Sequence, residues 1–414
     1  MSASPSSSDA PSPSAPTSSS APLHLAVALD GAGRHPAAWR EPGARPEALF
    51  TARYWVDAVA VAEAGLLDFV TLDDGLALQS TSADGPDGRT DLVRGRLDAV
   101  LTAARIAPLT RHIGLVPSVT TTHTEPFHIS KAVATLDHVS RGRAGVHVQV
   151  AGPPHEERHF GRRPAPLSGT ELYEEAADHV EVIRRLWDSW EDDAEIRDVA
   201  TGRFIDRDKL HYIDFEGRHF SVRGPSITPR PPQGRPVVSA VGASGDGEAS
   251  YRLVALSADV GYVNARDAGE AASAVAAIRR VREAAGLGEE PLHLFGELTV
   301  FLDEDAPAAT ARKERLDALA GHPYEDDSEV FTGTAAQLAD LLVERRSAGL
   351  SGFRLRPGVI AHDLPAITRG LVPELQRRGL FRTAYEADTL RGLLGLDPHP
   401  ANRYATPPSA GTAA

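Results

Sequence analysis

One segment of the chain has residue types that suit the binding of an anionic group. Residues 236–247 read PVVSAVGASGDG, so an apolar strand over 237–241 ends in small and hydroxyl residues before a helix expected near Glu248. A helix N-terminus offers unpaired backbone N–H groups and the positive end of the helix dipole, and both stabilise a phosphate. A phosphorylated cofactor would suit this turn. The same pattern also occurs in ordinary strand-to-helix turns, so both interpretations stay open.

Polar residues follow several other apolar runs. They are Asp73 and Asp74 after residues 68–72, Ser118 to His123 (SVTTTH) at the end of residues 113–118, and Ser244 and Gly245 after residues 237–241. An Asp in such a place often only caps the next segment, and Thr-rich strand ends often only make local hydroxyl hydrogen bonds. These residues are candidates for a site at the ends of strands.

Residues 144–150 (AGVHVQV) alternate between apolar and polar side chains. The three valines fall on one face of the expected strand, and His147 and Gln149 fall on the other. Because an imidazole titrates near neutral pH, His147 is the candidate catalytic group, as a hydrogen-bond donor or a base. The alternative is a core histidine with a structural hydrogen bond. The apolar residues of this strand slightly favour a substrate without high charge.

Short apolar runs and helical patterns alternate along most of the chain. The expected strands cover residues 23–29, 68–72, 113–118, 144–150, 237–241, 258–263, 292–302 and 352–355. The expected helices cover residues 50–64, 97–107, 126–139, 171–190, 247–257, 268–286, 334–348 and 363–379. Eight strands, each followed by a helix, predict an α/β fold of the (β/α)8 TIM-barrel type rather than a doubly wound sheet.

Two stretches interrupt this rhythm. Residues 191–235 form an insertion after the fourth unit, polar and rich in Gly and Pro, with a hairpin expected around 211–222. Residues 303–332 form a smaller insertion. The Ser/Pro/Ala-rich residues 1–21 and the last residues, 405–414, are expected to be disordered tails around one barrel domain over 22–404.

Composition excludes several classes of function. The 414 residues carry a formal net charge of −14 and no cysteine, which argues against nucleic acid or an anionic membrane as partner and excludes thiolate chemistry. No apolar run approaches the roughly 20 residues that cross a bilayer. We expect a cytoplasmic protein.

The sequence HEERH at residues 155–159 resembles the zinc motif HExxH in its letters. Pro153 and Pro154 precede it and Phe160 and Gly161 follow it, so the long helix that would aim both imidazoles at one ion is missing. We expect no metal site here, and interpret the segment as a loop over the barrel mouth.

Several separated segments together resemble the bacterial luciferase-like flavin-dependent monooxygenases, in the nitrilotriacetate, pristinamycin and dibenzothiophene-sulfone monooxygenase branch. The matching segments are GAGRHPAAWREP (31–42), residues 113–145, residues 173–194, residues 211–247 and ADTLRGLLGL (387–396). The resemblance implies a barrel that binds reduced FMN supplied by a separate flavin reductase. It further implies that O2 reacts at the flavin to a C4a-peroxide that oxygenates a small organic substrate, and that the protein is a homodimer or tetramer.

The resemblance also assigns roles to single residues. It places Ser244, the Gly245 amide and Tyr173 at the FMN phosphate, and Asp74, Ser118 and Thr121 near the flavin ring. The sequence departs from the family pattern at Gly169, where a His is usual, at His159, where an Asn is usual, and across residues 146–151. The departures at Gly169 and in residues 146–151 leave open a flavin-binding barrel without catalysis. A second alternative, an F420-dependent oxidoreductase, stays open because members of the wider luciferase-like superfamily use F420.

Overall fold

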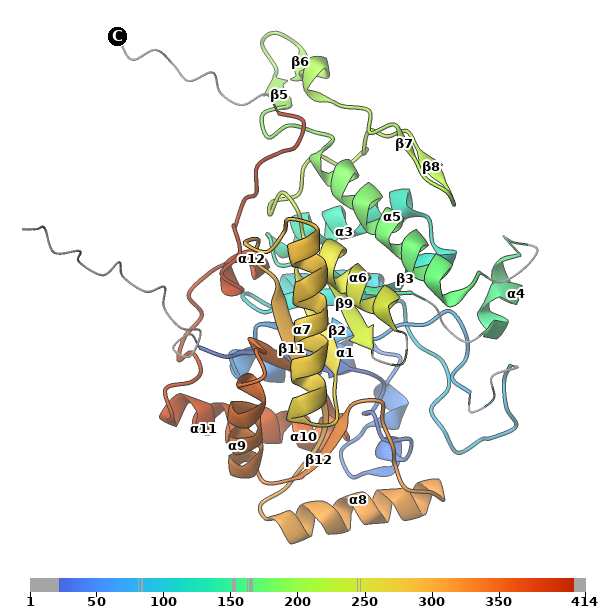
Figure 1. Ribbon diagram of the computed structural model, residues 1–414, viewed down its shortest axis with the longest axis vertical. Helices are drawn as coiled ribbons and strands as arrows, with labels where there is room; N and C mark the ends of the chain where they lie inside the picture. The colour runs from blue at the N-terminus through green and yellow to red at the C-terminus, as the bar shows by residue number, and fades with distance from the viewer. Residues whose placement is uncertain are drawn as a thin grey trace, which may run out of the picture.

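Eight parallel strands form a closed barrel at the centre of the computed structural model (Figure 1). The structure describes residues 22–80, 82, 85–150, 154–161, 163, 167–243, 245 and 247–405. The barrel strands are β1 (His24–Leu29), β2 (Phe69–Leu72), β3 (Gly114–Thr120), β4 (Gly145–Gln149), β9 (Val237–Ala243), β10 (Val260–Asn264), β11 (His293–Leu302) and β13 (Gly352–Pro357). They pair in the order β10-β9-β4-β3-β2-β1-β13-β11, and pairing of β10 with β11 closes the ring. The predicted (β/α)8 fold is confirmed.

A helix follows each barrel strand. These helices are α1 (Ala52–Ala64), α2 (Ala99–Ile106), α3 (Pro126–Ser140), α5 (Gly169–Asp188), α6 (Glu248–Ser257), α7 (Ala268–Ala284), α8 (Ala306–Ala320) and α10 (Ile360–Ala366). Further helices are α4 (Glu157–Phe160), α9 (Ala335–Arg346), α11 (Val372–Arg377) and α12 (Leu390–Leu393). Among the described residues, no helix combines the length and the apolar character needed to cross a membrane.

The two predicted insertions contain secondary structure of their own. Residues 191–235 hold the hairpins β5 (Glu195–Asp198) with β6 (Arg203–Ile205) and β7 (Phe215–Glu216) with β8 (Ser221–Val222), which lie beyond α5 at one end of the molecule (Figure 1). The second hairpin lies where the sequence predicted one. Residues 303–332 supply α8 and β12 (Glu329–Gly333), and β12 pairs with β11 outside the ring. This segment therefore belongs to the outer layer that surrounds the barrel.

Two element boundaries differ from the sequence prediction for identifiable reasons. Helix α5 begins at Gly169, two residues before the predicted start, because the Ser168 and Glu171 side chains form a capping box. The predicted helix 363–379 is divided by a π-helical turn over Ile367–Leu371. Pro365 and Pro373 flank this turn and lack the N–H groups that a continuous α-helix would use.

Successive side chains of each strand point alternately outward, toward the helices, and inward, into the barrel. Outward residues such as Val27, Val146, Val148 and Val238 join the large apolar cluster between the barrel and its helices. Inward residues near the amino ends of the strands form a second apolar cluster inside the ring. Its members are Ala26, Phe69, Val116, Val237, Val260, Tyr262 and Phe295, joined by Leu390, Leu394 and Leu396 from the C-terminal segment.

The C-terminal segment closes the bottom of the barrel. Leu390 is fully buried, and its N–H donates to the Gly142 carbonyl oxygen at 2.9 Å. On the opposite side, His293 Nε2 lies 2.7 Å from the Leu394 carbonyl oxygen, and Nδ1 lies 3.2 Å from Ser351 Oγ. The interior of the ring is therefore filled at this end and opens at the other, where the strands finish.

Shortening Leu390 tests this closure. We expect Leu390→Ala to lower the free energy of unfolding by about 2–5 kcal/mol, because it leaves a cavity against the interior cluster. Urea denaturation followed by circular dichroism measures the change. The control is Leu256→Ala, at a 37% exposed position, with an expected change below about 0.5 kcal/mol. Equal small effects at both positions would contradict the sealing role.

His293 makes the closure sensitive to acid. Burial, with the nearby His24, lowers the pKa of His293 from 6.5 to about 4. Below pH 6.5 the imidazole of His293 is protonated in the unfolded chain but stays neutral in the folded protein. The free energy of unfolding therefore falls as the pH drops from 6.5 toward 4. This contribution amounts to about 3 kcal/mol. We expect His293→Gln to flatten the pH dependence of urea midpoints over this range, and an unchanged slope would contradict the assignment.

Candidate functional site

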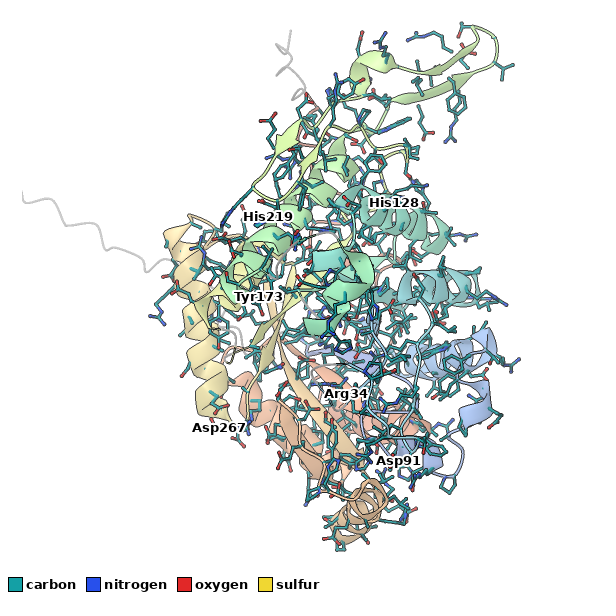
Figure 2. The ribbon with its side chains drawn as sticks, turned by 90° about the vertical axis from the view of Figure 1, so that its right-hand side faces the viewer. Arg34, Asp91, His128, Tyr173, His219 and Asp267 are labelled. Carbon is teal, nitrogen blue, oxygen red and sulfur yellow. The ribbon has the colours of Figure 1, made fainter. Side chains whose placement is uncertain are left out.

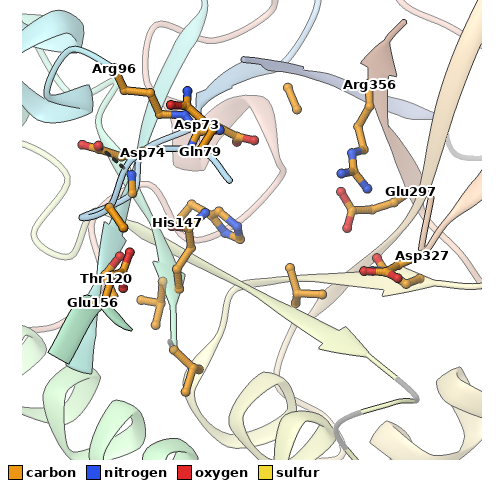
Figure 3. Close-up of a pocket in the computed structure, with 18 of the residues that line it drawn as sticks. Asp73, Asp74, Gln79, Arg96, Thr120, His147, Glu156, Glu297, Asp327 and Arg356 are labelled. Atoms are coloured by element: carbon orange, nitrogen blue, oxygen red, sulfur yellow. Dashed lines mark hydrogen bonds between the residues drawn. The ribbon is translucent and has the colours of Figure 1, made fainter. Parts of the chain in front are cut away.

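A cavity of about 610 Å3 opens at the carboxyl ends of the barrel strands (Figure 3). It is lined by the ends of β3, β4, β9, β10, β11 and β13, by the loop after β2, and by the first turns of α5. Its volume is within the range of about 300–1,000 Å3 typical of small-ligand pockets. In a barrel of this kind, working groups gather at this face.

The structure brings three of the predicted site residues to this cavity. Asp74, His147 and Tyr173 all line it, together with Gly169, the position of one departure from the family pattern. Figure 2 shows Tyr173 on α5. Gly245 is exposed in the turn after β9, with no atom within 4 Å of the place where a Cβ would stand. Ser244 lies outside the described residues, so its predicted role stays a prediction.

Two predicted residues, Ser118 and Thr121, are buried beside the cavity but do not line it. Ser118 is the register partner of His147 on the neighbouring strand, so its side chain faces the barrel interior. Its Oγ is buried and has no hydrogen-bond partner among the described residues. Thr121 donates its hydroxyl proton to the Gln149 carbonyl oxygen at 3.1 Å. The neighbouring Thr120 lines the cavity instead.

Asp74 both caps helix α2 and lines the cavity. Its carboxylate accepts hydrogen bonds from the Gly75 N–H at 2.7 Å and from the Ala99 N–H, the first residue of α2, at 2.8 Å. Burial nevertheless raises the pKa of Asp74 above its ordinary value. The capping function that the sequence left open is therefore present, and the side chain still faces the cavity.

His147 points from β4 into the cavity, as the alternation of its strand predicts (Figure 3). It is 2% exposed, and its Nδ1 lies 3.3 Å from Ser239 Oγ. Tyr262 packs edge-on against the imidazole at 5.2 Å between ring centres. Burial, and then the charge of Arg354, lower the pKa of His147 well below its ordinary value. The expectation of a ring that titrates near neutral pH is wrong, because the imidazole is neutral there.

An ion pair forms the far wall of the cavity. Arg354 on β13 binds the Glu297 carboxylate on β11 through Nε at 2.7 Å and Nη2 at 2.5 Å, and both side chains are nearly fully buried. The Arg354 guanidinium also stacks on the Tyr262 ring at 3.6 Å. Burial raises the pKa of Glu297 above its ordinary value, against the opposing effect of Arg354. Glu297 therefore holds Arg354 in place between the cavity and Tyr262.

A second charged group lies at the ends of β1 and β2. Arg96 binds both carboxylate oxygens of Asp30, at 2.9 and 3.0 Å. Arg34 reaches Asp30 and Asp73 only at 3.4 and 3.3 Å. Burial, and then the charge of Asp30, raise the pKa of Asp73. Arginine and carboxylate side chains therefore alternate around the mouth of the barrel.

The segment with the HEERH letters bends over this mouth. Residues Pro154–Glu156 form a 3-10 turn, and the helix that follows, α4, has four residues. The rings of His155 and His159 lie 6.3 Å apart at nearly a right angle. Glu156 lines the cavity, and its Oε1 accepts a hydrogen bond from the Leu76 N–H at 2.9 Å. This contact joins the loop after β4 to the loop after β2 across the mouth.

Sequence reasoning missed the charged wall although a signal was available. The strand GFRLRP places Arg354 and Arg356 two residues apart, with Phe353 and Leu355 on the other face. This is the same alternation that singled out His147. Glu297 likewise interrupts an apolar strand.

Removing the carboxylate of Glu297 tests the wall. We expect Glu297→Ala to destabilise the protein by about 3–5 kcal/mol, because Arg354 is left as a buried unpaired charge. Glu297→Gln keeps an acceptor, so we expect a smaller loss, and Arg354→Met combined with Glu297→Ala to recover part of it. Thermal or urea unfolding gives these values. The control is Asp57→Ala, which breaks surface pairs with Arg53 and Arg45, 84% and 43% exposed, and should cost less than about 1 kcal/mol. Additive losses in the double variant would contradict the pairing.

Comparison with known proteins assigns the family. Residues 32–352 match the family described as luciferase-like monooxygenase. The N-acetyl-S-(2-succino)cysteine monooxygenase of Bacillus subtilis (strain 168) is 31% identical, with 92% of this chain and 98% of the relative covered. Component A of the nitrilotriacetate monooxygenase of Aminobacter aminovorans is also 31% identical, with 93% and 98% covered.

The fold agrees with this assignment. The crystal structure of the long-chain alkane monooxygenase LadA superposes with a TM-score of 0.82 at 23% identity, covering 91% of this chain and 98% of that one. The match to the family extends over most of the barrel, and the cavity lies at the face where such barrels carry their working groups. The chain belongs to the luciferase-like monooxygenase family and is a flavin-dependent oxidoreductase.

Proposed function

We propose that the protein is an FMN-dependent monooxygenase that receives reduced FMN from a separate reductase and oxygenates a small organic substrate with O2. The family match carries this proposal, together with a cavity of suitable size that contains Asp74, His147 and Tyr173. One relative is named as a component A, which supports a system of more than one protein. The predicted homodimer or tetramer stays a prediction.

The residues around the cavity fit a flavin nucleotide. We assign the phosphate to Tyr173, the Gly245 N–H and Ser244, near the end of β9. A Cβ at Gly169 or Gly245 would meet no atom within 4 Å, so both positions leave room for a ligand. We assign the ring to the side of Asp74, Ser118 and Thr121, where the buried Ser118 Oγ lacks a protein partner among the described residues.

Reduced FMN, when bound, supplies the electrons with which O2 is activated. The protein's part is to hold the ring, exclude water and control protons. Glu156 and Leu76 join two loops across the mouth and limit access of solvent. Tyr262 and Phe295 close the floor beneath the cavity.

His147 is the group that we assign to proton control. Its Nδ1 faces Ser239 Oγ, and Nε2 has no partner among the described residues while the ring lines the cavity. Because the ring is neutral, Nε2 either donates one hydrogen bond or accepts one proton, according to its tautomer. A neutral imidazole beside Arg354 is a weak base, so hydrogen-bond donation is its favoured role.

A stopped-flow experiment tests the proposal. Anaerobic titration with reduced FMN should show saturable binding, and mixing with O2 should change the flavin absorbance before product forms. We expect His147→Ala to bind reduced FMN normally but to form product about 100-fold more slowly or worse.

The control is His138→Ala, which removes an exposed histidine on α3 and should change neither step. Turnover of His147→Ala at the normal rate would remove His147 from the mechanism. Failure to bind reduced FMN, or anaerobic turnover with F420 instead, would contradict the proposed function.

A further inference from the structure

The half of the cavity wall that the flavin proposal leaves unused carries arginine donors without protein acceptors. The residues assigned to FMN come from the half of the ring formed by β9, β4, β3 and β2, whereas β1, next to β2, and β13 belong to the other half. Arg356, at the carboxyl end of β13, lines the cavity there (Figure 3). Its side chain is only 10% exposed, so it is surrounded mainly by other residues of the protein.

Only one edge of the Arg356 guanidinium is used by the protein. Nη1 donates to Asp326 Oδ1 at 3.0 Å and to Ser328 Oγ at 3.2 Å. Nε and Nη2 have no hydrogen-bond partner among the described residues. These two donors border the cavity, where a ligand can reach them, and a planar carboxylate is the group that fits such a fork.

Asp326 does not fill this need, because it is already saturated with donors. Its carboxylate accepts from Thr299 Oγ1 and from the Tyr324 hydroxyl, both at 2.6 Å, in addition to Arg356. These contacts fix Asp326 at one edge of Arg356. The opposite edge is therefore held toward the cavity.

The loop after β1 brings a second arginine to the same place. Gly33 has φ +142°, and a Cβ there would lie 2.3 Å from the Gly358 carbonyl oxygen, so only glycine lets the loop run along the end of β13. The Arg34 N–H then donates to the Pro357 carbonyl oxygen at 2.9 Å. Arg34 also lines the cavity (Figure 2 shows its position), and among the described residues its Nη1 makes only the two long contacts with Asp30 and Asp73.

The surrounding carboxylates leave room for an anion. Arg354 and Arg96 have close carboxylate partners, in Glu297 and Asp30, but Arg34 has only contacts of 3.3 and 3.4 Å. The Glu297 carboxylate is already paired with Arg354. Asp327 also lines the cavity, but it is exposed and therefore solvated.

We propose that Arg356 and Arg34 form a subsite for a carboxylate of the organic substrate, so that the substrate is an organic acid. This inference rests on the proposed function, because it takes the cavity to be the substrate site. It adds to the slight expectation of a substrate without high charge the expectation of at least one carboxylate. Val148 and Val150, of the expected strand 144–150, do line the cavity, but β11 and β13 add a charged part to its wall.

Calorimetry on the FMN-loaded protein tests the subsite with three acids of increasing size. The probes are succinate, (carboxymethylthio)succinate and biphenyl-4-carboxylate, each compared with its methyl ester. We expect at least one acid to bind about 10- to 100-fold more tightly than its ester, because the ester lacks the charge-assisted hydrogen bonds. Arg356→Met should remove that preference, and Arg356→Lys should restore only part of it because it lacks the planar fork.

The matched control is Arg345→Met. Arg345 is 11% exposed and binds the 22% exposed Glu329 in a partly buried pair, but it does not line the cavity. It should lose similar stability and keep the preference for the acid. Absence of any preference for an acid in the unaltered protein, or equal effects of Arg345→Met and Arg356→Met on acid binding, would overturn the subsite. Weaker FMN binding by Arg356→Met, with acid binding unchanged, would also overturn it by assigning the arginine to the cofactor.

The same samples separate this inference from the proposed function. Oxygen-dependent oxidation of bound reduced FMN, followed by absorbance, reports the function without the acid. If oxidation and oxygenation of uncharged substrates occur without a preference for acids, only the subsite fails. If the acid preference is present and no oxygen chemistry is found, only the proposed function fails.

Discussion

Closure of an all-parallel ring is the constraint on which this structure depends. Successive side chains of a strand point to opposite faces, so every barrel strand must supply apolar residues to the helices and a different set to the interior. Strand β4 meets both demands with Val146 and Val148 outside and His147 inside. The interior is then divided along the barrel axis into an apolar lower part and a polar upper part. Chemistry is confined to the upper part because Leu390 and its neighbours fill the lower end.

The closed interior also explains why the charged residues occur in pairs. A guanidinium inside the ring cannot be stabilised by bulk water, so Arg354 requires Glu297 on the adjacent strand and the face of Tyr262. Burial, and then the charge of the same arginine, lower the pKa of the neighbouring His147. Arg354 thus adds to the effect of burial on a histidine to which it is not hydrogen-bonded. The charge of Arg354 acts on His147 through the electrostatic field rather than through a hydrogen bond.

Much of the fold could be predicted from the sequence because it follows from local periodicity. The eight strands, the helix after each, and the inward direction of His147 all follow from patterns within a single segment. The contacts that complete the cavity join distant segments, and the sequence could not show them. Arg354 and Glu297 are 57 residues apart, and their register is set by ring closure. Helix α8 and strand β12 were missed because residues 303–332 have weak apolar patterns. Tyr173 was identified by resemblance alone, because a tyrosine in an amphipathic helix usually packs against its neighbours and gives no sign of ligand binding.

The segment 303–332 has a consequence for how barrels of this kind diversify. It lies outside the ring of eight strands, yet its Asp326 and Ser328 hold one edge of Arg356. A segment outside the ring thus fixes the orientation of an inward-facing side chain on a barrel strand. Substitutions in this segment change the surroundings of Arg356 while the strand that carries it keeps its sequence, so the lining of the cavity can diverge without any change in the ring itself.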